Sequence, residues 1–261
     1  AEAQRDQIMH QRDEIQSSIT YAQKIQFAAL TPETIMNEML QEYFIYNRPR
    51  NIVSGDFYWA GRGNHNIYFA VADCTGHGVP GAFLSMLGIS LLNEIIISKE
   101  IIRPDSILNR LREKNIIALK KEPGSILKDG MDMTICLYDS TARTLQFSGA
   151  NNPLYLITDG DLRQIRGDKM PVAIHEVMDP FTLHELKLKA GDTFYTFSDG
   201  YADQFGGPRG KKFKYQNFKR LLASISGKAM HEQGLQLERE FEQWKGDNDQ
   251  VDDVVIIGLK F

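Results

Sequence analysis

A predicted strand, turn and helix at residues 71–88, VADCTGHGVPGAFLSMLG, most constrains what this chain can fold into. The apolar run at 69–72 predicts a strand covered on both faces, and Asp73 follows at its end. The TGHG sequence lets the backbone turn, and Pro80 suits the first helical position because its missing N–H has no helical partner there. A helix N-terminus pointing towards a carboxylate suggests a site for a metal-bound phosphate, and an ordinary turn with a solvated aspartate is the alternative.

The length and composition leave room for one large folded domain and an appendage. The 261 residues carry a net charge of −4, with basic residues spread along the chain, which predicts no general attraction to nucleic acid or membrane surfaces. Cys74 and Cys136 form neither a disulfide framework nor a zinc pattern, so we expect a reducing, cytoplasmic location. The apolar segment 79–92 is interrupted at Asn93 and Glu94, and it predicts a core helix rather than a membrane span.

Residues 1–30 form a predicted helix with a narrow apolar stripe. Ile8, Ile15, Ala22 and Ala29 are spaced seven apart, and Ile19 lies on the same side. This heptad spacing favours a coiled-coil seam, and a helix packed on its own domain is the alternative. We therefore expect a homodimer through Ile8, Ile15, Ile19 and Ala22. The abrupt start within a helical pattern indicates a piece of a longer protein with an upstream sensor domain.

Thr31 and Pro32 mark the expected boundary between this linker helix (1–30) and the main domain (31–261). Thr31 is suited to cap a following short helix, and Pro32 is suited to its first position.

The rest of the chain groups its strands and helices instead of alternating them. Strands are predicted at 42–49, 56–62, 66–73, 133–140, 144–150, 153–158, 161–166, 181–188, 193–199 and 254–261, and helices at 80–99, 104–121, 216–224 and 232–244. This order argues against a doubly wound parallel sheet. It indicates an α+β fold, most simply two stacked sheets with helices outside.

Four aspartates share one setting, at the end of an apolar or aromatic strand beside glycine or another acid. They are Asp56, Asp73, Asp199 and Asp252, the last of which is followed by Asp253. Each alone is typical of a turn. If the strand ends converge, the carboxylates repel one another unless divalent cations neutralise them. Oxygen ligands favour Mg²⁺ or Mn²⁺, and two such ions about 3.5–4 Å apart would activate a bridging water for attack on a phosphate ester.

Five motifs, in order along the chain, then carry a resemblance to a known family: SGDFYW, ADCTGHGVPGAFLSMLG, SGANNPLYL, GDTFYTFSDGYADQFGG and QVDDVVIIG. They closely resemble the metal-dependent type 2C (PPM) protein serine/threonine phosphatases of the SpoIIE/RsbU-like branch, over residues 47–261. The resemblance implies a four-layer αββα sandwich of two mainly antiparallel sheets flanked by helices. It also implies a centre of two Mn²⁺ or Mg²⁺ ions.

The resemblance assigns ligands to this centre. Asp73 would bridge both ions, with the backbone carbonyl of Cys74 as a further ligand. Asp56 would be a ligand on one side of the two-ion centre. Asp199 and Asp252 would be ligands on the other side, with Asp253 as the alternative to Asp252. The chain has alanine at 150 and valine at 254 and 255 where the family often has histidine and threonine. Neither departure removes an inferred ligand, so we expect activity.

Further residues are candidates for lesser roles. His77 could protonate the leaving serine oxygen, because imidazole titrates near neutrality, and a structural turn histidine is the alternative. Arg50 or Arg48 could hold the substrate phosphate through two hydrogen bonds, and an exposed arginine is the alternative. Asp129 and Asp132 precede the strand at 133–140 and could bind a third ion.

We therefore expect a cytoplasmic phosphatase that hydrolyses phosphoserine or phosphothreonine on a partner protein without a phosphoenzyme. By resemblance, the leading substrate is an anti-sigma-factor antagonist of the STAS type, and the N-terminal helix would carry a signal to the metal site. A catalytically silent module for dimerisation and partner docking is the alternative, and the retained aspartates argue against it. A two-metal nucleotide cyclase would need a βαββαβ order that the predicted elements lack.

Overall fold

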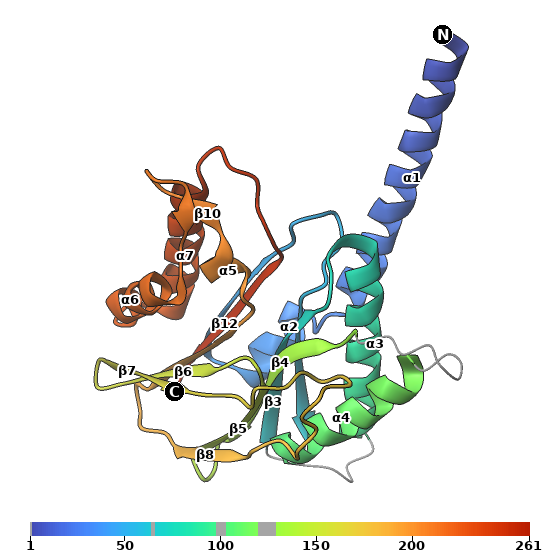
Figure 1. The fold of residues 1–261 in the computed structure, drawn as a ribbon. Helices are drawn as coiled ribbons and strands as arrows, with labels where there is room; N and C mark the ends of the chain where they lie inside the picture. The colour runs from blue at the N-terminus through green and yellow to red at the C-terminus, as the bar shows by residue number, and fades with distance from the viewer. Residues whose placement is uncertain (1, 64–65, 98–102, 120–128) are drawn as a thin grey trace.

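Two five-stranded sheets stack face to face (Figure 1). The computed structural model describes residues 2–63, 66–97, 103–119 and 129–261. All strand pairs within the two sheets are antiparallel. Sheet A has the order β1 (Glu42–Arg48), β12 (Val254–Lys260), β9 (Thr193–Phe197), β6 (Leu154–Thr158) and β7 (Asp161–Ile165). Sheet B has the order β2 (Phe57–Gly63), β3 (Asn66–Cys74), β4 (Met131–Asp139), β5 (Thr144–Ala150) and β8 (His184–Lys187).

Helices cover the outer face of each sheet. On sheet B lie α3 (Gly78–Ile97) and α4 (Pro104–Leu119), and on sheet A lie α6 (Tyr215–Ile225) and α7 (Met230–Lys245). An apolar core lies between each sheet and its helices, and we call these two the outer cores. A further apolar core fills the space between the sheets, where the ring centres of Phe69 and Phe194 are 5.7 Å apart. These layers confirm the predicted αββα sandwich.

Strand β3 is covered on both faces, as its continuous apolar run predicts. Successive side chains of a strand point to opposite faces. The side chains in the inter-sheet core are Ile67, Phe69 and Val71, and those in the core beneath α3 and α4 are Tyr68, Ala70 and Ala72. Packing on both faces therefore holds Asp73 at the end of a rigid strand.

Helix α3 begins at Gly78, so Pro80 lies within its first turn, where a missing N–H still has no helical partner. Gly88 lets α3 approach sheet B closely, because a Cβ there would lie 2.8 Å from Met131 Sδ. Of the described helices, α3 alone is long and apolar enough to cross a membrane, over Gly78–Ile96. In the structure 39% of that segment is buried, and Ile89 and Leu92 pack in the outer core of sheet B.

Two helices precede the sandwich: α1 (Glu2–Ala29) confirms the predicted N-terminal helix, and α2 (Glu33–Met39) confirms the short helix after it. The prediction that Thr31 caps α2 is wrong, because Pro32 is the N-cap residue and no side chain caps the helix. Thr31 Oγ1 instead donates to the Ala60 carbonyl at 3.0 Å and accepts the Ala60 N–H at 2.8 Å. It thereby satisfies backbone groups of the edge strand β2.

Two smaller differences from the predicted elements have local causes. The strand predicted at 181–188 is shortened to β8, because the N–H and hydroxyl of Thr182 donate to the Asp168 carboxylate at 2.7 and 2.8 Å. The sequence analysis also missed one helical turn, α5 (Gly200–Asp203), and the small hairpin of β10 (Phe205–Gly206) and β11 (Lys211–Lys212).

Helix α1 projects from the sandwich and is anchored near its C-terminal end (Figure 1). Among its residues Gln26 alone is buried. Gln26 Nε2 donates to the Ser54 carbonyl at 2.6 Å and to the Ser85 hydroxyl at 2.8 Å, and Oε1 accepts the Ser54 N–H at 3.0 Å. One side chain therefore connects α1 to the segment before β2 and to α3.

We expect Gln26→Ala to lower the free energy of unfolding by about 2–4 kcal/mol, because it removes the Gln26 acceptor of the buried Ser54 N–H and one of the two donors to the Ser54 carbonyl. Gln7→Ala, on the exposed part of the same helix, should change it by less than about 0.5 kcal/mol. Urea denaturation followed by circular dichroism measures both values. Equal effects of the two variants would contradict the anchoring role of Gln26.

Candidate metal centre

The strand ends bring aspartates from both sheets to one site. In sheet B, Asp73 lies directly opposite Asp132 in the register of β3 and β4. In sheet A, Asp199 follows β9 and Asp252 precedes the antiparallel β12, so both lie at the same end of that sheet. Burial raises the pKa of Asp73, and the charges of Asp56, Asp199 and Asp252 raise it further. These side chains therefore share one electrostatic environment.

Burial and mutual repulsion disfavour the charged form of these acids. Burial is the main cause of the raised pKa of Asp56, and neighbouring carboxylates contribute to it. Burial and then Asp252 raise the pKa of Asp199 to about 6, while a hydrogen bond with Asp73 acts in the opposite direction. Asp56 is 5% exposed, and its Oδ2 has no hydrogen-bond partner among the described residues. The site therefore favours a bound cation.

The donor chemistry fits a hard divalent ion. In the described part of the chain, no group of three or more His, Cys, Asp or Glu side chains is preassembled around a metal position. The available donors are nevertheless carboxylate and backbone oxygens, which suit Mg²⁺ and Mn²⁺. A cation would also compensate the buried, unpartnered Asp56 Oδ2.

The turn after β3 lies beside the aspartates and is held tightly. The Thr75 N–H donates to the Gly130 carbonyl at 2.9 Å. Gly55 packs so closely on this turn that a Cβ there would lie 2.5 Å from the Gly76 carbonyl oxygen. The Cys74 side chain is buried in the outer core, and burial raises the pKa of its thiol. The backbone carbonyl is therefore the candidate ligand atom of Cys74.

Asp252 and Asp253 have different surroundings. Asp253 is 2% exposed, and its two carboxylate oxygens accept the N–H groups of Arg50 at 2.7 Å and Gly55 at 2.8 Å. Asp252 is half-buried, and its Oδ1 accepts the Asp253 N–H at 2.9 Å. Asp253 thus fixes two backbone segments, whereas Asp252 keeps its other oxygen available.

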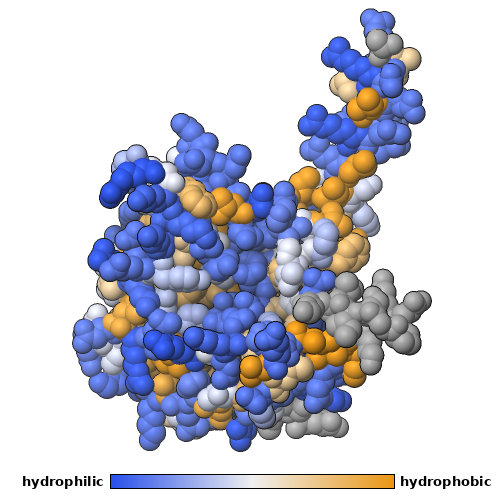
Figure 2. Space-filling model, viewed as in Figure 1, coloured by the Kyte–Doolittle hydropathy of each residue, from blue (hydrophilic) through white to orange (hydrophobic). Residues whose placement is uncertain are grey.

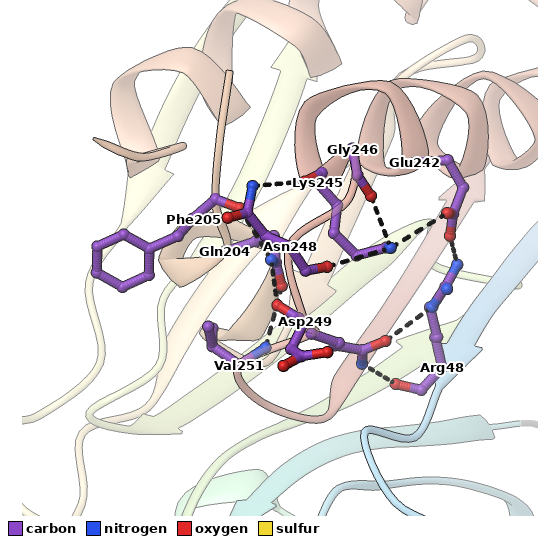
Figure 3. Close-up of polar contacts among 10 residues, drawn as sticks. Arg48, Gln204, Phe205, Glu242, Lys245, Gly246, Asn248, Asp249 and Val251 are labelled. Atoms are coloured by element: carbon purple, nitrogen blue, oxygen red, sulfur yellow. Dashed lines mark hydrogen bonds and ion pairs between the residues drawn. The ribbon is translucent and has the colours of Figure 1, made fainter. Parts of the chain in front are cut away.

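Arg48 belongs to a polar network beside α7 (Figure 3). Its guanidinium pairs with Glu242, and its Nε donates to Gln250 Oε1 at 2.7 Å. Gln204 holds the same loop by accepting the Val251 N–H at 3.1 Å. The structure therefore ties Arg48 to the loop that leads to Asp252, on the side of α7.

His77 and Arg50 are exposed beside the cluster. Burial raises the pKa of Asp252, and the positive charges of His77 and Arg50 act in the opposite direction, which places both near this carboxylate. His77 Nδ1 lies 3.2 Å from Asn51 Oδ1.

The two candidates for a third ion are placed differently. Asp132 lies within β4, which begins earlier than predicted, and its Oδ1 accepts a hydrogen bond from Asn151 Nδ2 at 2.7 Å. Asp129 is half-buried and lies before β4. Burial is the main cause of the raised pKa of Asp73 and of Asp199, and the charge of Asp132 adds to both.

The sequence analysis missed three residues that lie at this site. Asn151, which holds Asp132, has a left-handed φ of 58°, a conformation in which asparagine is enriched. Ser198 lowers the pKa of Asp56 through a hydrogen bond, against the larger effect of burial. Burial and then Asp199 raise the pKa of Tyr215. Asn151 and Ser198 stand within SGANNPLYL and TFSDGY, which is the signal that could have found them.

The stability of the metal-free protein should depend on pH through Asp199. Its pKa is about 6 in the folded protein and about 3.9 in an unfolded chain. Between these values the folded state binds a proton that the unfolded state lacks, so stability falls as pH rises through this range. With chelator present, Asp199→Asn should raise Tm at about pH 7, and the gain should shrink at about pH 5. Scanning fluorimetry measures this difference.

Asp247→Asn is the matched control, because Asp247 is exposed. It should leave Tm nearly unchanged at both pH values. A gain of equal size for Asp199→Asn at both pH values would contradict the assignment.

Comparison with known proteins identifies the family. The family model described as Stage II sporulation protein E (SpoIIE) matches residues 63–261. No curated protein sequence matches the chain. Among solved structures, the SiaA-PP2C domain of Pseudomonas aeruginosa is 29% identical, with a TM-score of 0.86 over 96% of this chain and 98% of that one.

Two further solved structures are less similar in sequence and show the fold. The PP2C phosphatase domain of SpoIIE from Bacillus subtilis, with a fragment of its regulatory domain, is 19% identical, with a TM-score of 0.68 over 84% of this chain and 63% of that one. The catalytic domain of the serine threonine protein phosphatase PstP, in complex with 2 manganese ions, is 19% identical, with a TM-score of 0.57 over 84% and 96%. This chain therefore belongs to the SpoIIE family and is a protein serine/threonine phosphatase of the PP2C (PPM) type.

Proposed function

We propose that this domain hydrolyses phosphoserine or phosphothreonine on a partner protein with two divalent ions, Mn²⁺ or Mg²⁺. The observation that carries the proposal is the hydrogen bond between Asp73 of sheet B and Asp199 of sheet A, within electrostatic reach of Asp252 and of Asp56, whose Oδ2 has no partner among the described residues. The manganese ions bound to PstP, which has the same fold, support the choice of metal.

Each aspartate is proposed to bind one or both of the metal ions. Asp73, at the end of rigid β3, is proposed as the ligand shared by both ions, with the Cys74 carbonyl beside it. Asp56 would bind one ion, and Asp199 and Asp252 would bind the other. When bound, such ions lower the pKa of water and neutralise charge on a phosphoryl group. Rigid strand ends keep these carboxylates in place and limit the reorganisation that binding requires.

The choice of Asp252 over Asp253 follows from their partners. Both oxygens of Asp253 already accept backbone N–H groups, whereas Asp252 has one oxygen without a described partner. For a third ion, Asp132 is the preferred candidate over Asp129, because it faces Asp73 across the β3/β4 ladder.

Arg50 is proposed to hold the substrate phosphate. It is exposed near Asp252, whereas the guanidinium of Arg48 is held by Glu242 and Gln250. A guanidinium can donate two parallel hydrogen bonds to a phosphate. His77, on the same side, is proposed to donate a proton to the leaving serine oxygen.

The proposed substrate is a phosphorylated STAS-type protein, which is supported by the resemblance to the SpoIIE/RsbU-like branch. The proposed control runs through α1. Ile8 and Ile15 are 60% and 62% exposed, and Figure 2 shows hydrophobic residues along the projecting helix. Pairing with α1 of a second copy would cover this stripe. The regulatory-domain fragment in the SpoIIE structure supports an upstream sensor, and a cytoplasmic location stays a prediction.

Phosphate release tests the proposal directly. We expect Mn²⁺- or Mg²⁺-dependent release from a phosphoserine STAS-type protein, with no release in chelator. Asp73→Asn should lower kcat by about a hundredfold or more, since it removes the ligand shared by both ions. Release from a small aryl phosphate alone would support the chemistry and contradict the substrate. A folded protein with no release and no Mn²⁺ binding would indicate the silent docking module.

The neighbouring acids Asp252 and Asp253 provide a matched pair of variants, compared by Mn²⁺ titration and by Tm. Asp252→Asn should lower Mn²⁺ affinity without lowering Tm, because it removes a carboxylate whose charged form burial disfavours. Asp253→Asn should lower Tm, because it weakens the charged acceptor of two backbone N–H groups. The reverse pattern would make Asp253 the ligand.

Light scattering tests the proposed dimer. The double variant Ile15→Glu with Ile19→Glu should be a monomer with altered activity, because charged side chains in a heptad seam repel across the interface. Gln7→Glu adds a charge outside the stripe and should leave the mass unchanged. A wild-type mass equal to that of one chain, or to that of the double variant, would exclude pairing through α1.

A further inference from the structure

An open cavity of about 590 Å³ lies on the side of the sandwich where α2, β1 and α7 meet. Phe27, near the end of α1, lines it and is 51% exposed. Five consecutive residues of β1, Tyr43–Asn47, also line it, and no lining residue belongs to the aspartate cluster. The cavity is therefore separate from the metal centre.

The walls of this cavity are aromatic and its rim is acidic. Tyr43, Phe44 and Tyr58 contribute rings, and Glu33 and Glu238 contribute carboxylates from α2 and α7. Neither glutamate forms an ion pair with any described residue. Burial and, to a lesser extent, the charge of Glu33 raise the pKa of Tyr43 and Tyr58, which places this carboxylate near both phenols.

The wall of the cavity also contains a hydrogen-bond acceptor without a described partner. Asn47 Oδ1 is buried and has no partner among the described residues. No lysine or arginine is among the lining residues that the structure describes, and His231 is the lining side chain that can gain a positive charge. The chemistry of the cavity therefore suits a cation with hydrogen-bond donors and an apolar stem.

The backbone of β1 adds a second point of attachment. Within the described sheets β1 is an edge strand that pairs with β12 alone. An edge strand can accept an extended segment through main-chain hydrogen bonds, while neighbouring pockets select its side chains.

We propose that this cavity binds the arginine side chain of an extended segment of a partner protein that lies along β1. The planar guanidinium suits stacking on the rings of Tyr43 and Tyr58 and donation to the Glu33 carboxylate near them, and Glu238 on α7 adds negative charge to the rim. Arginine is favoured over lysine, because a point-charge ammonium has neither the planar face nor the fork of donors.

Calorimetry with the 261-residue chain tests this site. The probe is the peptide acetyl-Val-Thr-Arg-Thr-Val-amide, and its counterpart carries neutral, isosteric citrulline in place of arginine. We expect the arginine peptide to bind about tenfold more tightly. Glu33→Gln combined with Glu238→Gln should remove this preference. Glu232→Gln, on the exposed surface of α7 outside the cavity, should keep it.

Every outcome decides one part of the proposal. Equal affinities of the two peptides, no heat of binding at millimolar concentration, or an arginine preference that survives the double variant would overturn it. Acetyl-arginine methylamide separates the two points of attachment: weaker binding than the peptide supports pairing along β1, and equal binding overturns that pairing. Circular dichroism confirms that the variants are folded, which is expected because both glutamates are exposed.

Discussion

Repulsion among half-buried and buried carboxylates is the constraint on which the rest of this structure depends. The two sheets bring Asp73, Asp199 and Asp252 together, and burial with mutual repulsion makes their charged forms costly. Only a scaffold that is rigid for other reasons can hold such a cluster. β3 provides this rigidity, because it is packed on one face against sheet A and on the other against α3 and α4. The apolar cores thus offset the unfavourable electrostatics of the site.

A second group of contacts fixes the backbone around the cluster without occupying its candidate ligands. Asp253 binds the N–H groups of Arg50 and Gly55, and Gln204 holds the loop that precedes Asp252. Gly55 in turn packs against the turn after β3, where any larger residue would meet the Gly76 carbonyl. The loops of sheet A and sheet B are therefore held to each other by side-chain hydrogen bonds to backbone groups and by close backbone packing. Of the two neighbouring carboxylates, Asp253 positions the backbone, and Asp252 is the candidate metal ligand.

Local patterns were sufficient to predict the layers of the fold and the setting of the aspartates. The continuous apolar run before Asp73 and the glycine-rich turn after it both depend on nearby residues, and the structure has both. What could not be predicted are contacts between distant segments. Thr31 bonds to Ala60 instead of capping α2, Asp132 gains its place from the β3/β4 register, and Arg48 pairs with Glu242. Thr31 takes its distant partner because the N–H and C=O of Ala60 are buried backbone groups that need hydrogen-bond partners.

The position of Gln26 connects this site to the projecting helix. Its amide bonds to Ser54, which lies just before Asp56, and to Ser85 of α3, the helix that follows Asp73 and its turn. A rotation of α1 that breaks these bonds would leave the buried Ser54 N–H without its Gln26 acceptor, which costs more than the loss of an exposed hydrogen bond. The two segments that carry Asp56 and Asp73 are therefore coupled to α1 through one side chain. The signal proposed to travel along α1 would therefore have a short physical route to the candidate metal ligands, since it would need only to shift the segment that bears Asp56, whose Oδ2 has no described partner.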